Sequence, residues 1–332
     1  MPFPPSPPPK PGFESLQEAA DWYAQLLEDD GEHSALRQRW QRWQRWLDES
    51  AEHREAWIYV QTISQRFQPL RGELHQPSAE ALLRSPRVSR RRALKLTALL
   101  TSGGLLSWMG YRYTPLRESL LAMTADNRTV TGEIKPMTLT DGSRIWLDTA
   151  SAMDIRYTTA ERQLFLRAGQ IFIATAPDPL RPFVVVSEQG RIQALGTRFS
   201  VSQQDESTQL NVYDGIVAVT PRQNGATRRV NAGQQWRFTA DGLGTIDRLD
   251  SADADWRRGK LSADDTPLGE VIARLSRYRR GYLSCDPDIA ALRLVGTFPL
   301  DNTDKALDMM SRALPIRIHR RFSWWVTVEK KV

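Results

Sequence analysis

Side chains that could carry out hydrolytic, redox or metal chemistry are scarce in this chain of 332 residues. Cysteine occurs once, as Cys285, so an intrachain disulfide and a cysteine-rich zinc site are both excluded. Of the four histidines, only His319 follows the apolar segment at residues 93–113. Paired carboxylates and a nucleophile elbow do not stand out after that segment either. The sequence therefore disfavours an enzyme that acts on an external substrate, and it predicts no cofactor and no metal site.

Arginine and tryptophan recur with a three-residue spacing near the N-terminus. The arginines are Arg39, Arg42 and Arg45, and a tryptophan follows each of them. On a helix this spacing places the two residue types on different sides, so we expect a cationic outer face and a tryptophan stripe in the core of a small domain. The cationic face could bind an acidic protein surface or DNA phosphates, or it could simply be solvated. We prefer a protein partner because of the family resemblance described below.

A basic run without acidic residues precedes the apolar segment. Its members are Arg84, Arg87, Arg90, Arg91, Arg92 and Lys95. These six cations match the net charge of +6, so the charge excess needs no nucleic acid to explain it. Because cations beside a membrane span tend to stay in the cytoplasm, the run predicts a bacterial inner-membrane protein with a cytoplasmic N-terminus and a periplasmic C-terminus. The residues around Arg90 and Arg91 are also similar to a twin-arginine export signal.

The apolar segment is short for a membrane helix. Its uncharged part, residues 96–111, contains 16 residues, which is about 24 Å of helix against a hydrocarbon core of about 30 Å. Extended to residues 93–113 it reaches about 31 Å, provided that Lys95 and Arg112 turn their charges towards the interfaces. We therefore predict a single transmembrane helix at 93–113, kept as an anchor. The alternative is a buried helix of a soluble protein.

The chain before the apolar segment divides into three parts. Residues 1–12 are rich in proline and are predicted to be a disordered tail. In residues 13–69 apolar side chains recur with a helical period in three stretches, which predicts a cytoplasmic module of three helices around one core. Residues 70–92 combine prolines, polar spacers and the basic run, which is typical of a linker.

After the apolar segment the period changes to two. Residues 125–249 contain short alternating segments bounded by turn residues such as Asp141-Gly142 and Asp214-Gly215, which predicts an all-β domain. Such strands suit a sandwich or a solenoid-like stack, and the period does not choose between them. Residues 255–331 have the order βαββαββ, which predicts a small α+β module. The predicted fold class is thus multidomain: an all-α module, one transmembrane helix, an all-β domain and an α+β module.

Three blocks of motifs resemble the FecR family of inner-membrane anti-sigma factors, over nearly the whole chain after residue 13. In the helical module the matching residues are Glu18-Ala19-Ala20-Asp21-Trp22, Trp46-Leu47, His53, Ala56-Trp57 and Val60. In the all-β domain they are Leu139-Thr140-Asp141-Gly142-Ser143, Leu147-Asp148-Thr149-Ala150-Ser151, Arg181-Pro182-Phe183-Val184-Val185, Leu195-Gly196-Thr197-Arg198-Phe199 and Ala232-Gly233-Gln234. The C-terminal module looks like the short N-terminal fold of secretins and TonB-dependent receptors. These motifs are specific in combination.

The resemblance implies signalling across the cell envelope. In the family, the helical module binds an extracytoplasmic-function sigma factor and keeps it from RNA polymerase. The candidate contact residues here are Trp22, Arg39, Arg42, Arg45, Trp46 and Trp57. The outer part is expected to bind the periplasmic signalling domain of a TonB-dependent siderophore or haem receptor, whose ligand-loaded state triggers release. Membrane proteases are expected to cut near residues 93–125, and no direct contact with nucleic acid is implied.

The pair Gly196 and Thr197 resembles the position at which members of this family break their own backbone by an N-to-O acyl shift. The Thr197 hydroxyl follows the Gly196 carbonyl by one residue, and Gly196 without a Cβ tolerates the strained approach that the attack needs. The other interpretation is a bulge at Gly196 before an ordinary strand. From sequence alone the bulge is the simpler explanation, and only the family context favours self-cleavage.

A second hypothesis is a membrane-tethered envelope protein that binds glycan or peptidoglycan. Its candidate stacking side chains are Trp146, Trp236, Trp324 and Trp325. Tryptophans in strands more often pack against neighbouring strands, so this hypothesis ranks below the first.

Overall fold

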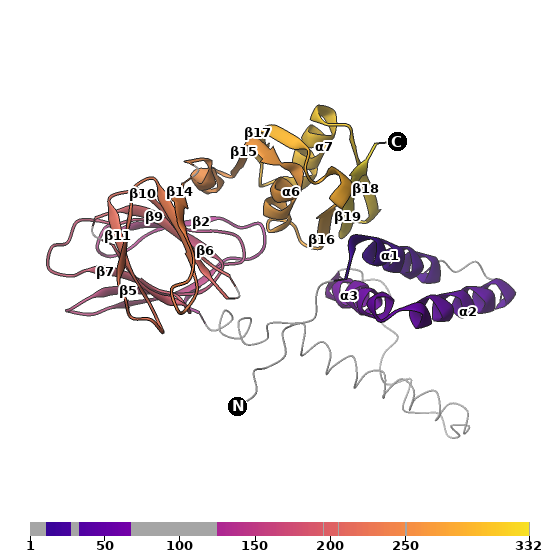
Figure 1. The fold of residues 1–332 in the computed structure, drawn as a ribbon, viewed down its shortest axis with the longest axis horizontal. Helices are drawn as coiled ribbons and strands as arrows, with labels where there is room; N and C mark the ends of the chain where they lie inside the picture. The colour runs from indigo at the N-terminus through magenta and orange to yellow at the C-terminus, as the bar shows by residue number, and fades with distance from the viewer. Residues whose placement is uncertain are drawn as a thin grey trace, which may run out of the picture. The chain divides into compact units, whose positions relative to one another are not determined.

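The structure is a computed structural model that describes residues 11–27, 33–67, 125–194, 196–204, 206–249 and 251–331 (Figure 1). The predicted linker, export signal and transmembrane helix, residues 70–113, lie outside these described residues. Within the described ranges, no helix combines the length and the apolar character that crossing a membrane requires. The chain divides into two compact units, residues 1–116 with 319–327 and residues 117–318 with 328–332.

The N-terminal module consists of three helices, as the period predicts: α1 (Phe13–Leu27), α2 (His33–Glu49) and α3 (Ala51–Phe67). Its core is formed by Leu16, Ala19, Ala20, Trp46, Ala56, Trp57 and Val60. Trp43 packs against Trp57 with ring centroids 5.1 Å apart, and Trp40 packs on the outside of Trp43 at 4.9 Å. Trp40 remains 49% exposed, so the prediction that all three tryptophans lie in the core is wrong for this one.

The all-β domain consists of two seven-stranded sheets. One sheet has the order β1 (Asn127–Arg128), β4 (Ala152–Tyr157), β5 (Arg162–Ala168), β7 (Phe183–Val186), β8 (Gly190–Ala194), β11 (Ile216–Pro221), β12 (Arg228–Asn231). The other has the order β14 (Ile246–Arg248), β13 (Gln234–Phe238), β10 (Thr208–Asp214), β9 (Arg198–Gln203), β6 (Gln170–Ala174), β3 (Arg144–Leu147), β2 (Lys135–Thr138). The pair β5 and β7 is parallel, whereas the neighbouring pairs β4–β5 and β7–β8 are antiparallel.

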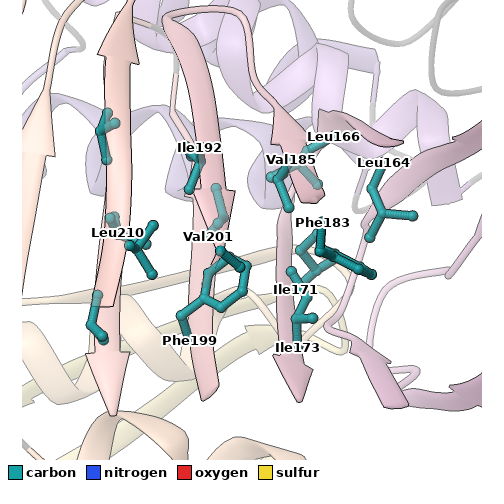
Figure 2. Packing of buried hydrophobic residues seen from close by; sticks show 14 of the residues in the cluster. Leu164, Leu166, Ile171, Ile173, Phe183, Val185, Ile192, Phe199, Val201 and Leu210 are labelled. Atoms are coloured by element: carbon teal, nitrogen blue, oxygen red, sulfur yellow. The ribbon is translucent and has the colours of Figure 1, made fainter. Parts of the chain in front are cut away.

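The two sheets share one hydrophobic core. Figure 2 shows side chains of both sheets in this cluster, among them Leu164, Val185 and Ile192 of the first sheet and Ile171, Phe199 and Leu210 of the second. Alternating residues are buried in strands such as β5 and β8, which is the physical basis of the period of two, whereas β6 and β7 are buried at consecutive positions. The strands of each sheet also succeed one another in chain order. The domain is therefore a sandwich whose chain advances like a solenoid, and both predicted alternatives describe a part of it.

The arrangement of strand pairs repeats along the chain every 46 residues. The antiparallel pair β4–β5 contains the partners Met153 and Leu166, and the pair β9–β10 contains Phe199 and Val212, each 46 positions later. Both pairs have a register irregularity next to these partners. Repeated units that stack in chain order produce such equivalences.

The C-terminal module has the predicted order βαββαββ, with two short 3₁₀ helices in addition. Its elements are η3 (Ser251–Arg258), β15 (Lys260–Pro267), α6 (Leu268–Ser276), β16 (Tyr282–Cys285), η4 (Pro287–Ile289), β17 (Arg293–Pro299), α7 (Thr303–Ala313), β18 (Ile316–Phe322) and β19 (Trp325–Lys330). The side chain of Asn302 accepts a hydrogen bond from the N–H of Lys305 and so caps α7. One face of each helix is buried, for example Leu268 and Leu275 of α6.

Candidate functional site

The predicted cleavage pair lies in the connection that leaves β8 in one sheet and enters β9 in the other. Gly196 has a φ of 76°, in the left-handed region that glycine adopts without a steric cost. Thr197 is buried, with 4% of its surface exposed. The sequence therefore places a left-handed glycine before a buried threonine, and this much agrees with both the bulge and the self-cleavage interpretation.

Thr175 holds the main chain of Thr197. The N–H of Thr197 donates to Oγ1 of Thr175 at 2.9 Å, and the N–H of Thr175 donates to the carbonyl of Thr197 at 3.1 Å. The Thr175 hydroxyl also donates to that carbonyl at 3.2 Å. Thr175 comes directly after β6, which pairs with β9 up to the partners Ala174 and Arg198. The pairing of β6 with β9 thus brings Thr175 to the candidate site, although 22 positions separate it from Thr197 in the sequence.

The side-chain hydroxyl of Thr197 takes no part in these hydrogen bonds with Thr175. Its Oγ1 is buried and has no hydrogen-bond partner among the described residues. A buried polar atom without a partner costs about 1–3 kcal/mol of stability. Seven such side-chain atoms occur among the described residues, and the Thr197 hydroxyl is the one that lies at the predicted cleavage position. The hydroxyl that an N-to-O acyl shift would use as its nucleophile is thus neither tied to the backbone nor exposed to solvent.

Gly215 closes the site from the turn between β10 and β11. Its φ is 78°, and a Cβ at this position would lie 2.6 Å from the carbonyl oxygen of Gly196 and 2.7 Å from Cγ2 of Thr197. Both distances are shorter than any ordinary contact, so only glycine fits without displacing the turn. Asp214-Gly215 is a turn signal in the sequence, but its approach to Thr197 could not be predicted because Gly215 and Thr197 are 18 positions apart.

A buried ion pair joins two of the family motifs. Nη1 of Arg162 lies 2.7 Å from Oδ2 of Asp141, and each side chain is 4% exposed. Nε of Arg162 also donates to the carbonyl of Arg181 at 3.0 Å. Burial alone would raise the pKa of Asp141, but hydrogen bonds from Ser143 and Arg162 outweigh it and hold the pKa below its usual value. Nη1 of Arg162 also donates to the carbonyl of Ala176 at 3.1 Å, so the network ties the turn at residues 139–143 to the residue after Thr175.

A second buried carboxylate lies at the junction with the C-terminal module. Asp148 accepts hydrogen bonds from the hydroxyl of Tyr278 at 2.6 Å and from Nη2 of Arg277 at 2.8 Å. Nη1 of Arg277 also donates to Oε1 of Gln170 at 3.1 Å. Burial raises the pKa of Asp148, and the charge of Arg277 and the Tyr278 hydroxyl counter this only in part. The junction therefore couples the β domain to the residues that follow α6.

The predicted sigma-factor contacts divide into two groups. Trp46 and Trp57 are buried, and Trp22 is half-buried with its ring 6.4 Å from that of Trp46. Trp46 stacks on His53 at 4.5 Å, and its Nε1 donates to Glu18 at 2.6 Å. These motif residues thus build the core of the module, which leaves the surface of the buried tryptophans unavailable to a partner.

The arginines are more accessible than the tryptophans. Arg42 and Arg45 are exposed, as the helical spacing predicts. Arg39 is half-buried, and its Nη1 donates to the carbonyl of Gln25 at 2.7 Å, which ties α2 to α1. Arg90 and Arg91 of the export signal lie outside the described residues. The surface that the structure leaves for a partner therefore includes Arg42, Arg45 and the exposed Trp40.

The tryptophans of the glycan hypothesis are mostly covered. Trp236 and Trp325 are 0% and 1% exposed. Trp146 is half-buried, with the ring of Phe172 at 5.7 Å and the guanidinium of Arg257 at 5.3 Å from its own ring. Trp236 and Trp325 cannot stack on a sugar in this fold.

The lone cysteine is not activated. Cys285 is half-buried in β16, and burial raises the pKa of its thiol to about 11, so the thiolate that would act as nucleophile is scarce at neutral pH. Among the described residues, no group of histidine, cysteine and acidic side chains could hold a metal ion. The Gly196-Thr197 turn is the strongest candidate site that remains.

Comparison with known proteins agrees with this architecture. The family model described as FecR protein matches residues 125–218, from the start of the all-β domain into β11. This range contains Thr175, Gly196, Thr197 and Gly215. Residues 125–218 are thus similar to the FecR family, which confirms the resemblance of the motifs that lie in this range, and we call the all-β domain the FecR domain.

Two solved structures have a similar fold. Both are of a candidate anti-sigma factor from Parabacteroides distasonis ATCC 8503, solved at 1.65 and 2.50 Å, and each is 23% identical to this chain. The first covers 62% of this chain and 99% of its own length with a TM-score of 0.52, and the second covers 62% and 98% with a TM-score of 0.51. No curated protein sequence matches the chain.

Proposed function

We propose that the chain is a transmembrane anti-sigma factor. Its helical module holds an extracytoplasmic-function sigma factor in the cytoplasm, and its FecR domain and C-terminal module receive a signal in the periplasm. The observation that carries the proposal is the FecR match over residues 125–218, and the fold of the candidate anti-sigma factor from P. distasonis supports it. The signal is proposed to come from the periplasmic signalling domain of a ligand-loaded TonB-dependent receptor for a siderophore or haem.

The exposed arginines of α2 are the proposed contact with the sigma factor. Arg42 and Arg45 are solvent-accessible cations on one helix, and complementary charge on a partner would speed association and orient it. Purification of the tagged full chain from its bacterium, followed by mass spectrometry, tests this. We expect a sigma factor to be recovered with the wild type and much less with Arg42→Glu/Arg45→Glu.

A matched control is a second charge reversal on the FecR domain. Arg222 and Arg229 are also exposed, so Arg222→Glu/Arg229→Glu changes the net charge by the same amount at a different place. Equal loss of the sigma factor in both double variants would mean that total charge matters rather than the α2 surface. Recovery that is unchanged in both would remove the arginines from the proposed contact.

Self-cleavage between Gly196 and Thr197 is the second part of the proposal. The left-handed Gly196, the buried unpaired hydroxyl of Thr197 and the close approach of Gly215 all support it. A blot of the chain tagged at both ends tests it: the wild type should give two fragments and Thr197→Ala one full-length band. A single identical band in both would contradict self-cleavage. Membrane proteases would then release the helical module by cuts near residues 93–125.

A further inference from the structure

The turn at Gly196 and Thr197, which we call the cleavage turn, has a structural counterpart elsewhere in the FecR domain. Ser151 follows Ala150, whose φ of 49° lies in the same left-handed region as that of Gly196. The N–H of Ser151 donates to Oγ1 of Thr129 at 2.9 Å, and the N–H of Thr129 donates back to the Ser151 carbonyl at 2.9 Å. Each of these three residues precedes its equivalent in the cleavage turn by 46 positions, the repeat length of the domain. The repeat therefore builds the same turn twice.

Gly169 completes the equivalence. It precedes Gly215 by 46 positions, its φ is 77°, and a Cβ there would lie 2.2 Å from Oγ of Ser151. Both copies thus have a left-handed residue, a hydroxyl residue after it, a glycine pressed against the hydroxyl residue, and a threonine that holds its main chain. The two copies share their frame, so a difference between them is informative about cleavage.

The copies differ in the hydroxyl that would attack. Oγ of Ser151 accepts from the N–H of Gln170 at 2.9 Å and lies 3.1 Å from the Gln170 carbonyl, to which it can donate. Oγ1 of Thr197 has no partner among the described residues. A hydroxyl whose lone pair and proton are both engaged is a poor nucleophile, whereas an unengaged one is free to attack. This difference explains why one copy is suited to cleavage and the other is a structural turn.

The hydroxyl of Thr175 takes the place of a main-chain carbonyl as the acceptor for the N–H of Thr197. In a regular antiparallel pair, the N–H of Thr197 would donate to the carbonyl of the residue opposite. Here it donates to the Thr175 hydroxyl instead, while the reverse bond from the Thr175 N–H is kept. A carbonyl can only accept, whereas a hydroxyl can both accept and donate. The nitrogen of the scissile peptide bond is therefore in contact with a group that can return a proton to it.

We propose that Thr175 is a catalytic residue of the self-cleavage site, whose hydroxyl holds the Thr197 nitrogen and donates to it as the Gly196–Thr197 peptide bond breaks. The inference rests on the proposed self-cleavage. Oγ1 of Thr197 forms a bond to the carbonyl carbon of Gly196, the bond from that carbon to the Thr197 nitrogen breaks, and the proton lost by Oγ1 ends on the nitrogen, which becomes an amine. Water then hydrolyses the ester, which leaves a carboxylate on Gly196 and restores the Thr197 hydroxyl.

The test is the cleavage rate of the full chain after synthesis, followed by the appearance of the fragment that begins at Thr197. Thr175→Val keeps the side-chain volume and removes the hydroxyl, and we expect it to slow cleavage about a hundredfold. Thr175→Ser keeps the hydroxyl and should restore the rate to within about threefold of the wild type. Hydroxylamine cleaves the ester but not the amide, so the defect of Thr175→Val should persist when hydroxylamine is added.

Thr129→Val is the matched control, because it removes the equivalent hydroxyl from the structural copy of the turn. It should cleave like the wild type. The inference is overturned if Thr175→Val cleaves at the wild-type rate, if Thr175→Ser is as slow as Thr175→Val, or if Thr129→Val is equally slow. A wild-type chain that never cleaves would overturn self-cleavage itself, and this inference with it.

Discussion

At the scale of single residues, Gly215 decides whether the cleavage turn can form. The Cβ of Gly215→Ala would meet the Gly196 carbonyl oxygen at 2.6 Å, in addition to the strain of a left-handed alanine. Gly233→Ala is the control, because Gly233 has a φ of 80° and open space around its Cβ position. We expect about 1 kcal/mol of destabilisation for Gly233→Ala and about 2 kcal/mol more for Gly215→Ala.

This comparison is best made in the Thr197→Val background, which lacks the hydroxyl that the proposed cleavage requires. Urea denaturation gives the free energy of unfolding of both glycine variants. Equal destabilisation would mean that the turn yields to the added Cβ, and that the close approach of Gly215 is not needed.

Asp141 should make the stability of the FecR domain depend on acid pH. Its pKa is lowered in the folded chain, so folding favours the ionised form. That stabilisation is present above the ordinary carboxyl pKa of about 3.9, and it is lost as the pH falls through the lowered pKa of the folded state. Asp141→Asn, which leaves the charge of buried Arg162 unpaired, should cost about 3 kcal/mol at pH 7 and less near pH 3.

Denaturation between pH 3 and pH 7 measures this dependence. Asp214→Asn is the control, because the pair of Asp214 and Arg198 is exposed, at 60% and 61%. An exposed pair of this kind contributes about 0–1 kcal/mol. The account of Asp141 fails if both variants lose the same stability at every pH.

The residues of the candidate site were only partly predictable from sequence. Gly196 and Thr197 are adjacent, so a local motif reveals them. Thr175 and Gly215 reach the site through the pairing of β6 with β9 and through the turn after β10, and no local pattern assigns them to the site. The signal that could have found them is the spacing of 46 residues between Thr129 and Thr175, between Ser151 and Thr197, and between Gly169 and Gly215.

At the scale of elements, α6 and the residues after it hold the C-terminal module to the FecR domain. Arg277→Ala leaves the buried Asp148 with the Tyr278 hydroxyl and without its cation. We expect a loss of about 2 kcal/mol, below the usual 3–5 kcal/mol for a broken buried pair because Arg277 is itself 40% exposed. The junction should loosen, and residues 249–259 should become more sensitive to protease.

Arg293→Ala in the same module is the control. Arg293 lies 4.0 Å from Asp265, and both side chains are exposed, at 60% and 76%. An exposed pair of this kind contributes about 0–1 kcal/mol, so its removal should leave the protease pattern unchanged. Matching digestion of the two variants would show that Asp148 does not hold the junction.

Most helices and strands were predictable from the sequence, because the geometry of each type of element fixes the spacing of its buried apolar side chains. Buried alternation defined the strands, and apolar residues three and four apart defined the helices. Trp40 is the exception, since a helical stripe becomes core only where another element covers it. Whether the strands would form a sandwich or a stack could not be decided, because that choice depends on contacts between sheets that the period does not encode.

At the scale of the whole molecule, the proposed function places a sigma-binding helical module and a FecR domain on opposite sides of a membrane. The described residues comprise a helical module with exposed arginines and a FecR domain in which the left-handed Gly196 precedes the buried Thr197. The connecting residues 70–113 carry the predicted span but lie outside the described ranges, so the membrane topology stays a prediction.

The most direct test of the anti-sigma role compares the two ends of the chain in one experiment. Residues 1–84 and residues 125–331 are each immobilised and incubated with the same bacterial extract and with purified peptidoglycan. The account predicts that residues 1–84 retain a sigma factor and that residues 125–331 retain neither. If residues 1–84 retain no sigma factor, or if residues 125–331 retain peptidoglycan, the anti-sigma proposal is contradicted.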